Sequence, residues 1–191
     1  MSAPRSAPGS PVRLRPLTEA DFTDRYLAWF RDPEVTRFLE ARNISREDAV
    51  DHLRRGREGD RWRLYAICEA GDGRHVGNLK VGPIDRRHGV SDLVTVIGER
   101  DVQGRGYGRA AISLGIDIAF REMGLRKLSA SIDSRNEASL RAYLAAGFAK
   151  EATLRDHFVE TLDGATVLSD KIHVACFNPD AGPGHNAEDT H

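Results

Sequence analysis

Three glycines, at positions 104, 106 and 108, stand one residue apart between an apolar run and an amphipathic segment. The apolar run is 93–97, and the amphipathic segment carries apolar residues at helical spacing from Ile112 to Met123. Glycines let a backbone curl so that several N–H groups point to one place, beside the positive end of a helix dipole. Arginines at 100, 105 and 109 add positive charge. The segment therefore predicts a strand, a loop and a helix that together bind a phosphate or pyrophosphate.

Other interpretations of this loop are open. The pattern Gly106-x-Gly108-x-x-Ala111 formally fits a dinucleotide fingerprint, but residues 99–103 separate it from the preceding strand. A P-loop is excluded because the sequence holds no Gly-Lys-Ser or Gly-Lys-Thr. A flexible connection without a ligand is disfavoured, since three glycines cost conformational entropy unless their geometry is needed. Titration with NAD(P) and CoA would distinguish the dinucleotide alternative.

Periodicity outside the loop predicts the order strand, helices, three strands, helix, strand, helix and two strands. Consecutive strands favour antiparallel pairing, and the strand–helix–strand step in the second half favours one parallel pair. We expect an α+β fold, a mixed and mostly antiparallel central sheet with helices on both faces. The expected strands lie near 12–16, 62–68, 75–81, 93–97, 128–132, 148–154 and 166–175. Helices are expected near 18–30 and 45–56; a short one is expected to begin at 33, another to end near 123, and a last one to surround Tyr143.

Length and composition bound the function class. The chain has 191 residues, which suits a single domain over 12–176 with disordered tails at 1–11 and 177–191. Lys and Arg number 28 against 29 Asp and Glu, so there is no basic surplus for coating nucleic acid. No apolar run is long enough for a membrane helix. We therefore expect neither a nucleic-acid nor a membrane partner.

Cysteine and histidine usage add two expectations. Two cysteines, Cys68 and Cys176, are too few for a disulfide framework and favour a reducing compartment. The first eleven residues lack the apolar core of a secretory signal, so we expect a cytoplasmic protein. The seven histidines show no metal-ligand spacing with Cys or carboxylates, so we expect no metal.

Two motifs carry a family resemblance. The pattern Q-x-x-G-x-G at 103–108 resembles the acyl-CoA loop of the GNAT superfamily of N-acetyltransferases, and N-x-x-S-x-x-x-Y-x-x-x-G-F at 136–148 resembles its second motif. The residues at 32–35, 77–78, 97–99 and 104–107 are similar to those of the branch that includes ribosomal-protein and amino-sugar N-acetyltransferases. The resemblance spans about 12–176. It implies a GNAT-like fold in which the strand before the loop splays from its neighbour.

The resemblance implies acetyl-CoA, or another acyl-CoA, as co-substrate. The glycine loop would hold the pyrophosphate, and the edge of the strand 94–97 would pair with the pantetheine arm. Asn136 would contact that arm, although it is equally suited to cap its helix. The implied donor-binding residues are Val94, Val96, Ile97, Gln103, Gly104, Arg105, Gly106, Tyr107, Gly108, Arg109, Asn136 and Ser139.

Transfer to an amine needs a neutral amine and a proton for the departing thiolate. Tyr143 matches the family's general acid, although its helical spacing also suits plain core packing. Asp92 aligns with a carboxylate that relays the amine proton; as an alternative it is an exposed strand-end residue. Glu99, His88 and His157 are weaker candidates to titrate. Cys68 lies on an apolar strand face, so we expect direct attack in a ternary complex rather than a covalent intermediate.

The acceptor is less constrained. A small amine, an amino sugar and a protein N-terminus all remain open, as does an acyl donor on a carrier protein. A non-catalytic acyl-CoA-binding module is the alternative to an enzyme, and the chain is expected as a monomer or homodimer. Lys80 and Arg155 are expected near the acceptor end. The candidate acceptor-binding residues are Tyr26, Trp29, Phe38, Asn78 and His157.

Overall fold

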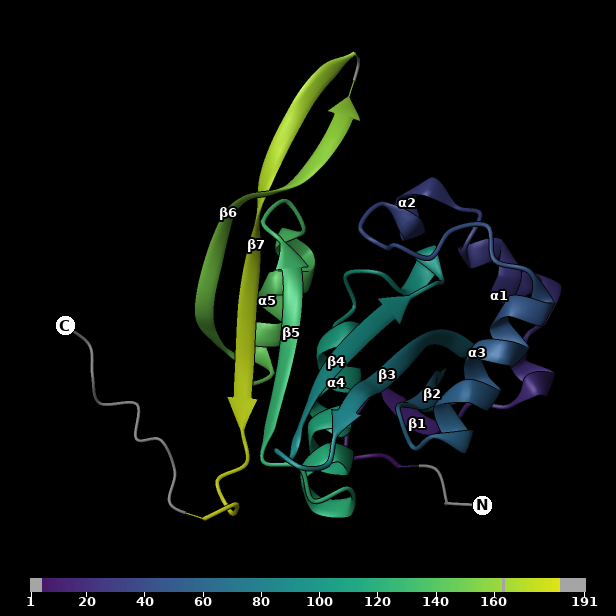
Figure 1. Cartoon of the computed structure of the whole chain (residues 1–191). Coiled ribbons are helices and arrows are strands. Elements are labelled where there is room, and N and C mark those ends of the chain that lie inside the picture. Colours follow the sequence, from purple (N-terminus) through teal and green to yellow (C-terminus); the bar gives the residue numbers. More distant parts are fainter. Residues whose placement is uncertain (1–4, 163, 183–191) are drawn as a thin grey trace.

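The computed structural model describes residues 5–162 and 164–182 and forms one seven-stranded sheet (Figure 1). The strand order is β1-β2-β3-β4-β5-β7-β6, and every neighbouring pair is antiparallel except β4 with β5. This mixed α+β sheet confirms the expected fold class, and a single parallel pair is not the doubly wound sheet that a dinucleotide site requires. The strands are β1 (Val12–Pro16), β2 (Arg63–Glu69), β3 (His75–Asp85), β4 (Val90–Ile97), β5 (Lys127–Asp133), β6 (Ala149–Leu162) and β7 (Ala165–Phe177).

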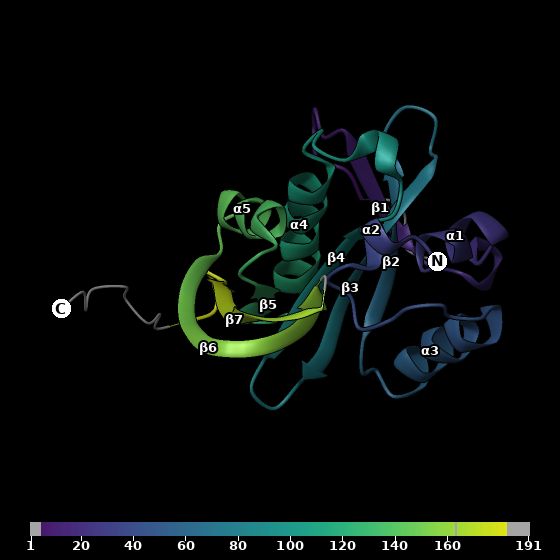
Figure 2. The ribbon, with the colours of Figure 1, turned by 90° about the horizontal axis from the view of Figure 1, so that it is seen from above.

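Helices cover both faces of the sheet, as the sequence predicts (Figure 2). One face of the first strands carries α1 (Asp24–Trp29) and α3 (Arg46–Glu58), and α2 (Pro33–Thr36) lies between them in the chain. The opposite face carries α4 (Tyr107–Asp117) and α5 (Glu137–Ala145). Short turns complete the set: η1 (Glu19–Asp21), η2 (Arg100–Val102) and the π-helical η3 (Ile118–Glu122).

Strand alternation divides the core into two clusters. We call the side of Ala66, Asn78, Asp92 and Ser129 the front face, because register places these side chains on one side of the sheet. Over β1–β3 the front face packs on α1 and α3, and the back face packs on α4. Fully burying each large aliphatic side chain stabilises the fold by about 1.5–3 kcal/mol. The front cluster includes Leu17, Phe22, Leu27, Leu53 and Cys68, and the back cluster includes Leu14, Ile67, Leu79, Leu93, Ile112 and Leu128.

The sheet opens between its two halves. β4 pairs with β5 at only three positions, the last of which is Asp92 opposite Ser129. Beyond that pair β4 keeps β3 as its partner and β5 keeps β7, so the strands diverge (Figure 1). We call this opening, between residues 93–97 of β4 and the end of β5, the split. Along the split, β4 has no strand neighbour on its β5 side, which is the geometry that the family resemblance implies.

The first helix differs from the expected single helix over 18–30. Thr18 begins only the turn η1, and the Asp21 carboxylate accepts a hydrogen bond from the Thr18 backbone N–H at 2.7 Å. Asp21 also pairs with Arg15 of β1 at 2.6 Å, so this turn is tied to the sheet. A second cap, Thr23, accepts from the backbone N–H of Tyr26 and starts α1. Two capping residues close together therefore make two elements where periodicity indicates one.

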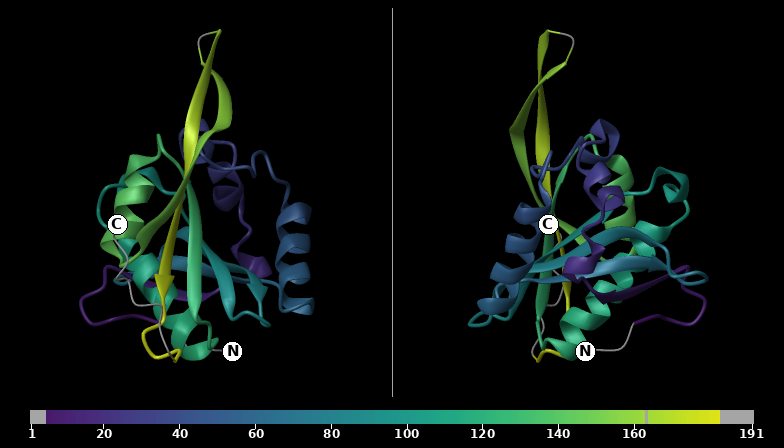
Figure 3. Two further views of the ribbon diagram at one scale, coloured as in Figure 1. Left: turned by 60° about the vertical axis from the view of Figure 1, so that its left-hand side comes forward. Right: turned by 90° about the vertical axis from the view of Figure 1, so that its right-hand side faces the viewer.

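The last two strands are longer than the expected 148–154 and 166–175. They form a hairpin that projects beyond the rest of the sheet (Figures 1 and 3). Along its outer part Val159 faces Leu168 across the ladder, and these side chains are 71% and 52% exposed. Polar residues occupy most of residues 155–166, so the apolar alternation that identifies a strand is missing there.

Parts of the two segments that were expected to be disordered tails contact the domain. Arg5 bridges to Leu14 of β1 and pairs with Glu122 at 2.8 Å. Asn178, just past β7, donates to the Leu125 carbonyl at 3.2 Å. The described parts of the tails at 1–11 and 177–191 therefore include residues held against the domain, while 1–4 and 183–191 lie outside the described residues. Within the described residues, no helix is both long enough and apolar enough to cross a membrane.

Candidate functional site

The glycine loop has the backbone geometry of an anion cradle. Gly104 and Gly106 have φ angles of +76° and +78°, in the left-handed region that favours glycine. Gly106 is the N-cap of α4 and brings no side chain to the first N–H groups of that helix. A Cβ at either glycine would meet nothing within 4 Å, and one at Gly108 would meet Ile97 at 3.9 Å. Open space therefore lies beside the helix N-terminus, where a phosphate is stabilised.

The arginines around the loop are available to an anion. Arg105 and Arg109 have no ion pair with any described residue. Arg100 makes only a long contact with Asp32, at 3.8 Å. These charges, together with the helix N-terminus, fit the pyrophosphate that the sequence predicts here.

One flank of the loop is fixed by a network of charges. The Tyr107 hydroxyl donates to Glu69 of β2 at 2.9 Å. Arg74 binds the same carboxylate at 2.6 Å and Asp101 at 2.7 Å. The hydrogen bond to Glu69 raises the pKa of Tyr107. Tyr107, predicted as a donor-binding residue, thus uses its hydroxyl to anchor the start of α4 to the sheet.

Tyr143 lies at the start of the split. Its hydroxyl donates to the Leu93 carbonyl at 2.8 Å, and Leu93 is the first β4 residue past the last β4–β5 pair. The ring is 4% exposed and packs edge-on against Phe148, with centroids 5.0 Å apart. Burial raises the pKa of Tyr143 to about 12. The phenol is therefore protonated near neutral pH.

Asp92 stands on the front face at the same level. Its Oδ1 accepts a hydrogen bond from Ser129 Oγ on β5 at 2.9 Å, and its side chain is exposed. Tyr143 reaches the split from α5 on the back face. The candidate acid and the candidate base thus approach the split from opposite faces of the sheet.

Thr95 is a feature that sequence reasoning missed. Its Oγ1 is buried and makes no hydrogen bond of good geometry with a described residue, but it lies beside the Tyr143 hydroxyl, whose pKa it lowers against the larger effect of burial. It lies on the free length of β4, two residues beyond Leu93, and its side chain is on the back face. A buried hydroxyl without a partner costs free energy unless a ligand satisfies it. A hydroxyl within a strand predicted to be apolar was the available signal.

Asn136 and Ser139 have a structural role. Asn136 caps α5, its Oδ1 accepting from the Ser139 backbone N–H at 3.2 Å. This satisfies one of the free N–H groups at the helix start. Helix capping is the role that the sequence analysis gave for Asn136 as the alternative to donor binding.

Three of the predicted acceptor residues meet around His75. Tyr26 and Trp29 are buried, at 6% and 5% exposure, and their ring centroids lie 6.0 Å and 5.0 Å from that of His75. His75 Nε2 lies 3.0 Å from Asn78 Oδ1. A cavity of about 170 Å³ borders these aromatic rings, with Asp21 also in its wall. Most of the aromatic surface of α1 is therefore core, and its remaining access is through this cavity.

Phe38 and His157 lie apart from that group. Phe38 follows α2, and the Arg135 guanidinium lies 5.9 Å from its ring centroid. Arg135 also binds Asp133 at 2.7 Å and Glu160 of β6 at 2.6 Å. His157 is exposed at a bulge of β6 and packs against Phe158. The predicted acceptor residues thus form two groups. One group lies on α1 and β3, and the other lies near Arg135 and the β6 bulge, at the base of the hairpin.

Two other candidate titrating groups are engaged elsewhere. Glu99 accepts hydrogen bonds from Trp29 Nε1 and Arg25 Nε, both at 2.7 Å. Burial by itself would raise the pKa of Glu99, but these hydrogen bonds outweigh it and lower the pKa. His88 pairs with Asp85 at 2.8 Å in the turn between β3 and β4, away from the glycine loop. Glu99 therefore joins α1 to the end of β4, and His88 does not line the split.

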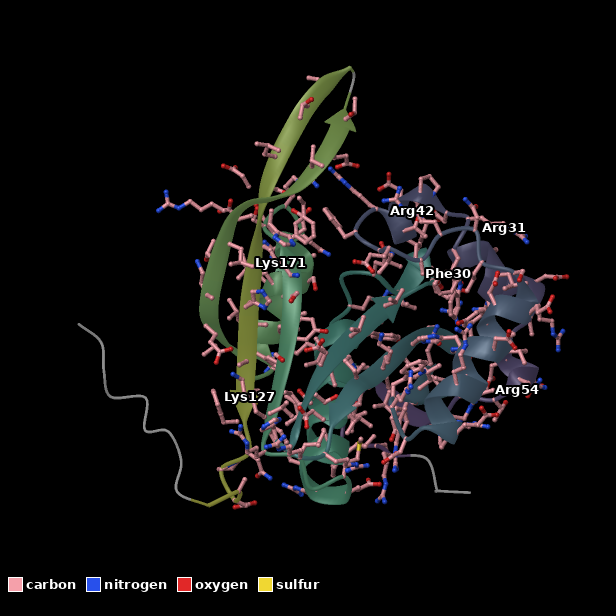
Figure 4. The ribbon with its side chains drawn as sticks, in the orientation of Figure 1. Phe30, Arg31, Arg42, Arg54, Lys127 and Lys171 are labelled. Atoms are coloured by element: carbon pink, nitrogen blue, oxygen red, sulfur yellow. The ribbon has the colours of Figure 1, made fainter. Side chains whose placement is uncertain are left out.

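A polar row on the front face was also missed. Ser129 and Ser131 of β5 alternate with buried apolar residues, and Ser131 Oγ lies 3.1 Å from His173 Nδ1 of β7. Figure 4 shows Lys127 and Lys171 on the same β5–β7 half, and Arg42 on the helical half. Polar residues at every second position of an otherwise buried strand were the signal.

Comparisons agree with this geometry. The model of the acetyltransferase (GNAT) domain family matches residues 12–149. The N-acetyltransferase p20 of Bacillus licheniformis is 27% identical over 154 residues, 76% of this chain and 82% of that protein. YjcK of Bacillus subtilis, a probable N-acetyltransferase, is 29% identical over 123 residues, 64% of this chain and 66% of that protein.

Solved structures share the fold. The spermidine N-acetyltransferase of Vibrio cholerae, solved with CoA and spermine, superposes with a TM-score of 0.76 at 18% identity, covering 88% of this chain and 96% of that one. The ribosomal-protein-S5-alanine acetyltransferase of Vibrio fischeri gives a TM-score of 0.74 at 18% identity, covering 95% and 100%. With the family model matched over most of its domain and the fold shared, the chain belongs to the GNAT family and is an N-acetyltransferase.

Proposed function

We propose that the protein moves an acetyl or other short acyl group from acyl-CoA to a primary amine by direct attack in a ternary complex. The observation that carries this proposal is the hydrogen bond from the buried Tyr143 hydroxyl to the Leu93 carbonyl at the start of the split. It puts a protonated phenol at the start of a free strand edge, residues 93–97, whose other end leads to the anion cradle. A thioester whose arm follows that edge has its sulfur within reach of a proton donor.

The donor site is proposed along α4 and β4. The pyrophosphate binds at the N-terminus of α4, where Gly104 and Gly106 leave space and Arg105 and Arg109 supply charge. The pantetheine arm adds to the free edge of β4 as a strand would. The unpartnered Thr95 hydroxyl supports this path, since a pantetheine amide would give it a hydrogen-bond partner.

The proposed chemistry begins with a neutral amine. Its nitrogen attacks the thioester carbonyl carbon, the C–S bond breaks, and the thiolate takes a proton from Tyr143. A thiol has an ordinary pKa of about 8.5, so the thiolate is a fair leaving group and the acid contributes a modest part of the rate. In this scheme Asp92 receives the amine proton directly or through water, and its hydrogen bond from Ser129 supports the assignment.

The acceptor is proposed as the amine of a small molecule, an amino sugar or a protein N-terminus. The similar fold from Vibrio cholerae was solved with spermine, and the one from Vibrio fischeri is named for alanine of ribosomal protein S5. A reducing, cytoplasmic location is part of the proposal. It is supported by the two cysteines, Cys68 and Cys176, which are both free.

A thiol-release screen tests the proposed function. Acetyl-CoA and longer acyl-CoA donors are offered with spermidine, a nucleotide-linked amino sugar and an alanine-starting peptide. The expected result is thiol release matched by one amide per thiol with at least one amine. Acetyl-pantetheine in place of acetyl-CoA tests a carrier-borne arm, because that arm lacks the adenosine phosphates. Tight acyl-CoA binding without thiol release for any amine would contradict the proposal.

A further inference from the structure

The front face of β5 and β7 carries one histidine in an ordered polar contact. Ser131 lies opposite His173 in the β5–β7 ladder, and Ser131 Oγ is 3.1 Å from His173 Nδ1. The imidazole is half-buried and Ser131 is exposed. In Figures 1 and 3, α5 lies on the back of these strands, and no helix of the described chain covers their front. The pair is therefore open to a molecule on the front face.

This pair borders the split. Ser129 faces Asp92 in the last β4–β5 pair, and Ser131 follows two residues later on the same face. Two residues along a strand advance about 6.6 Å, which brings Ser131 beside the diverging part of β4. On β4 the front-face residue at this level is Val94, which is 39% exposed. Val94 and Ser131 therefore lie on the two sides of the split on the front face, and His173 lies one strand further, on β7.

Carboxylates and imidazoles differ in general as proton acceptors. An exposed carboxylate ordinarily has a pKa of about 3.9 and is a poor acceptor for an ammonium proton, whereas imidazole titrates near 6.5. A general base is most effective when its pKa lies near the working pH. A hydroxyl bound to one ring nitrogen fixes the imidazole and leaves the other nitrogen to take a proton.

We propose that His173, positioned by Ser131, is the proton acceptor for the amine, and that Asp92 attracts the incoming ammonium. This inference rests on the proposed function and revises its assignment of the base. The ammonium N–H bond breaks and its proton goes to His173 Nε2. The freed lone pair then forms the N–C bond, the C–S bond breaks, and Tyr143 gives its proton to the sulfur. The second N–H proton leaves the new amide nitrogen through water and restores the Tyr143 phenol. His173 afterwards releases its proton to water.

Charged neighbours of His173 come from several strands. Lys171 precedes it by two residues on β7 and opposes a positive imidazole. Asp92 of β4 favours one. Lys80 of β3, opposite Val94 on the same face, adds a positive charge and has no ion pair with a described residue. Two further pairs of charges near this face are already formed, and Ala152, opposite His173 on β6, carries no charge. The paired groups are Lys127 with Glu151, and Asp133 with Arg135.

The test is the pH dependence of kcat and kcat/KM with an amine found in the screen. His173→Gln is expected to lower kcat about 100-fold and to remove the acid limb of the profile, with KM for acetyl-CoA unchanged. Added imidazole is expected to restore part of the rate. Ser131→Ala is expected to lower kcat about 10-fold, with the acid limb kept but displaced. His88→Gln, a matched change in the turn before β4, is expected to behave as wild type.

Acetyl-CoA affinity and thermal unfolding of each variant show that the fold is intact. Wild-type kcat and an unchanged acid limb in His173→Gln would overturn the inference. If Asp92→Asn then removed the limb, the base would be Asp92. Absence of turnover in the wild type with every amine would overturn the proposed function and this inference with it, so the two failures are distinguishable.

Discussion

The Tyr143 hydroxyl donates to the Leu93 carbonyl at 2.8 Å, which joins α5 to β4 at the residue where the sheet opens. The partner is a backbone atom, so the position of the phenol depends directly on the path of β4. Burial raises the pKa of Tyr143 to about 12, and the ring rests edge-on against Phe148. A tyrosine that looks like ordinary core thus also lies where the split begins, which is the position at which we propose that it gives a proton.

Tyr143→Phe separates chemistry from donor binding. We expect kcat to fall about 100-fold while the Kd of CoA stays within about twofold, because the ring keeps its packing and only the acidic proton is lost. The Leu93 carbonyl loses its partner, which costs about 1–3 kcal/mol of the free energy of unfolding. Steady-state kinetics, calorimetric titration with CoA and urea unfolding measure the three quantities. An unchanged kcat would remove Tyr143 from the mechanism.

The glycines of the loop can be compared with a glycine elsewhere. Gly106 and Gly124 have φ angles of +78° and +67°, and a Cβ at either meets nothing within 4 Å. Alanine should therefore cost each site a similar strain, about 1–2 kcal/mol of stability. Only Gly106→Ala puts a methyl group into the space proposed for the pyrophosphate.

We expect Gly106→Ala to weaken CoA binding at least tenfold and Gly124→Ala to leave it unchanged. Pantetheine, which has no phosphates, should bind both variants as it binds wild type. Calorimetric titration measures these affinities, and thermal unfolding confirms matched stability. Equal CoA affinity for the two variants would place the pyrophosphate elsewhere.

Sequence pattern predicted the parts of the molecule that depend on local physics. Helix periodicity and the three closely spaced glycines indicated the strand, loop and helix that form the cradle, and the second motif led to Tyr143. The hairpin was predicted short because its outer residues interact with few others and so show no apolar pattern. Thr95 and the Ser131–His173 contact were missed because both depend on which strands are neighbours. That β7 lies between β5 and β6 is a property of the whole sheet.

Gly98 lies at the contact between α1 and the end of β4. A Cβ there would lie 2.0 Å from Cδ2 of the Trp29 indole, whose Nε1 binds Glu99. We expect Gly98→Ala to move the indole, break this hydrogen bond and lower the free energy of unfolding by about 1–3 kcal/mol. Urea unfolding and tryptophan emission measure the effect. Gly71→Ala is the control, since its Cβ meets nothing within 4 Å, and it should change stability by less than about 0.5 kcal/mol. Equal stability of the two variants would contradict the close packing of Trp29 on Gly98.

Arg135 links the hairpin to β5 through an ion pair whose strength depends on pH. Burial would raise the pKa of Asp133, but hydrogen bonds from Arg135 outweigh it and lower the pKa below its ordinary 3.8. The ionised carboxylate therefore stabilises the fold above about pH 4, and this stabilisation is lost as pH falls through the lowered pKa. Arg135 also binds Glu160 of β6 at 2.6 Å.

Arg135→Gln should lower the free energy of unfolding by about 2 kcal/mol at pH 7, since hydrogen bonds to a charged partner are lost. The difference from wild type should shrink as the pH falls below about 4, where Asp133 becomes protonated in wild type as well. Urea unfolding at several pH values measures it. Arg141→Gln, which removes an exposed pair with Glu137, should cost less than about 0.5 kcal/mol at any pH. A difference for Arg135→Gln that stayed constant from pH 3 to pH 7 would assign its effect to packing against Phe38, because that contact does not depend on the charge of Asp133.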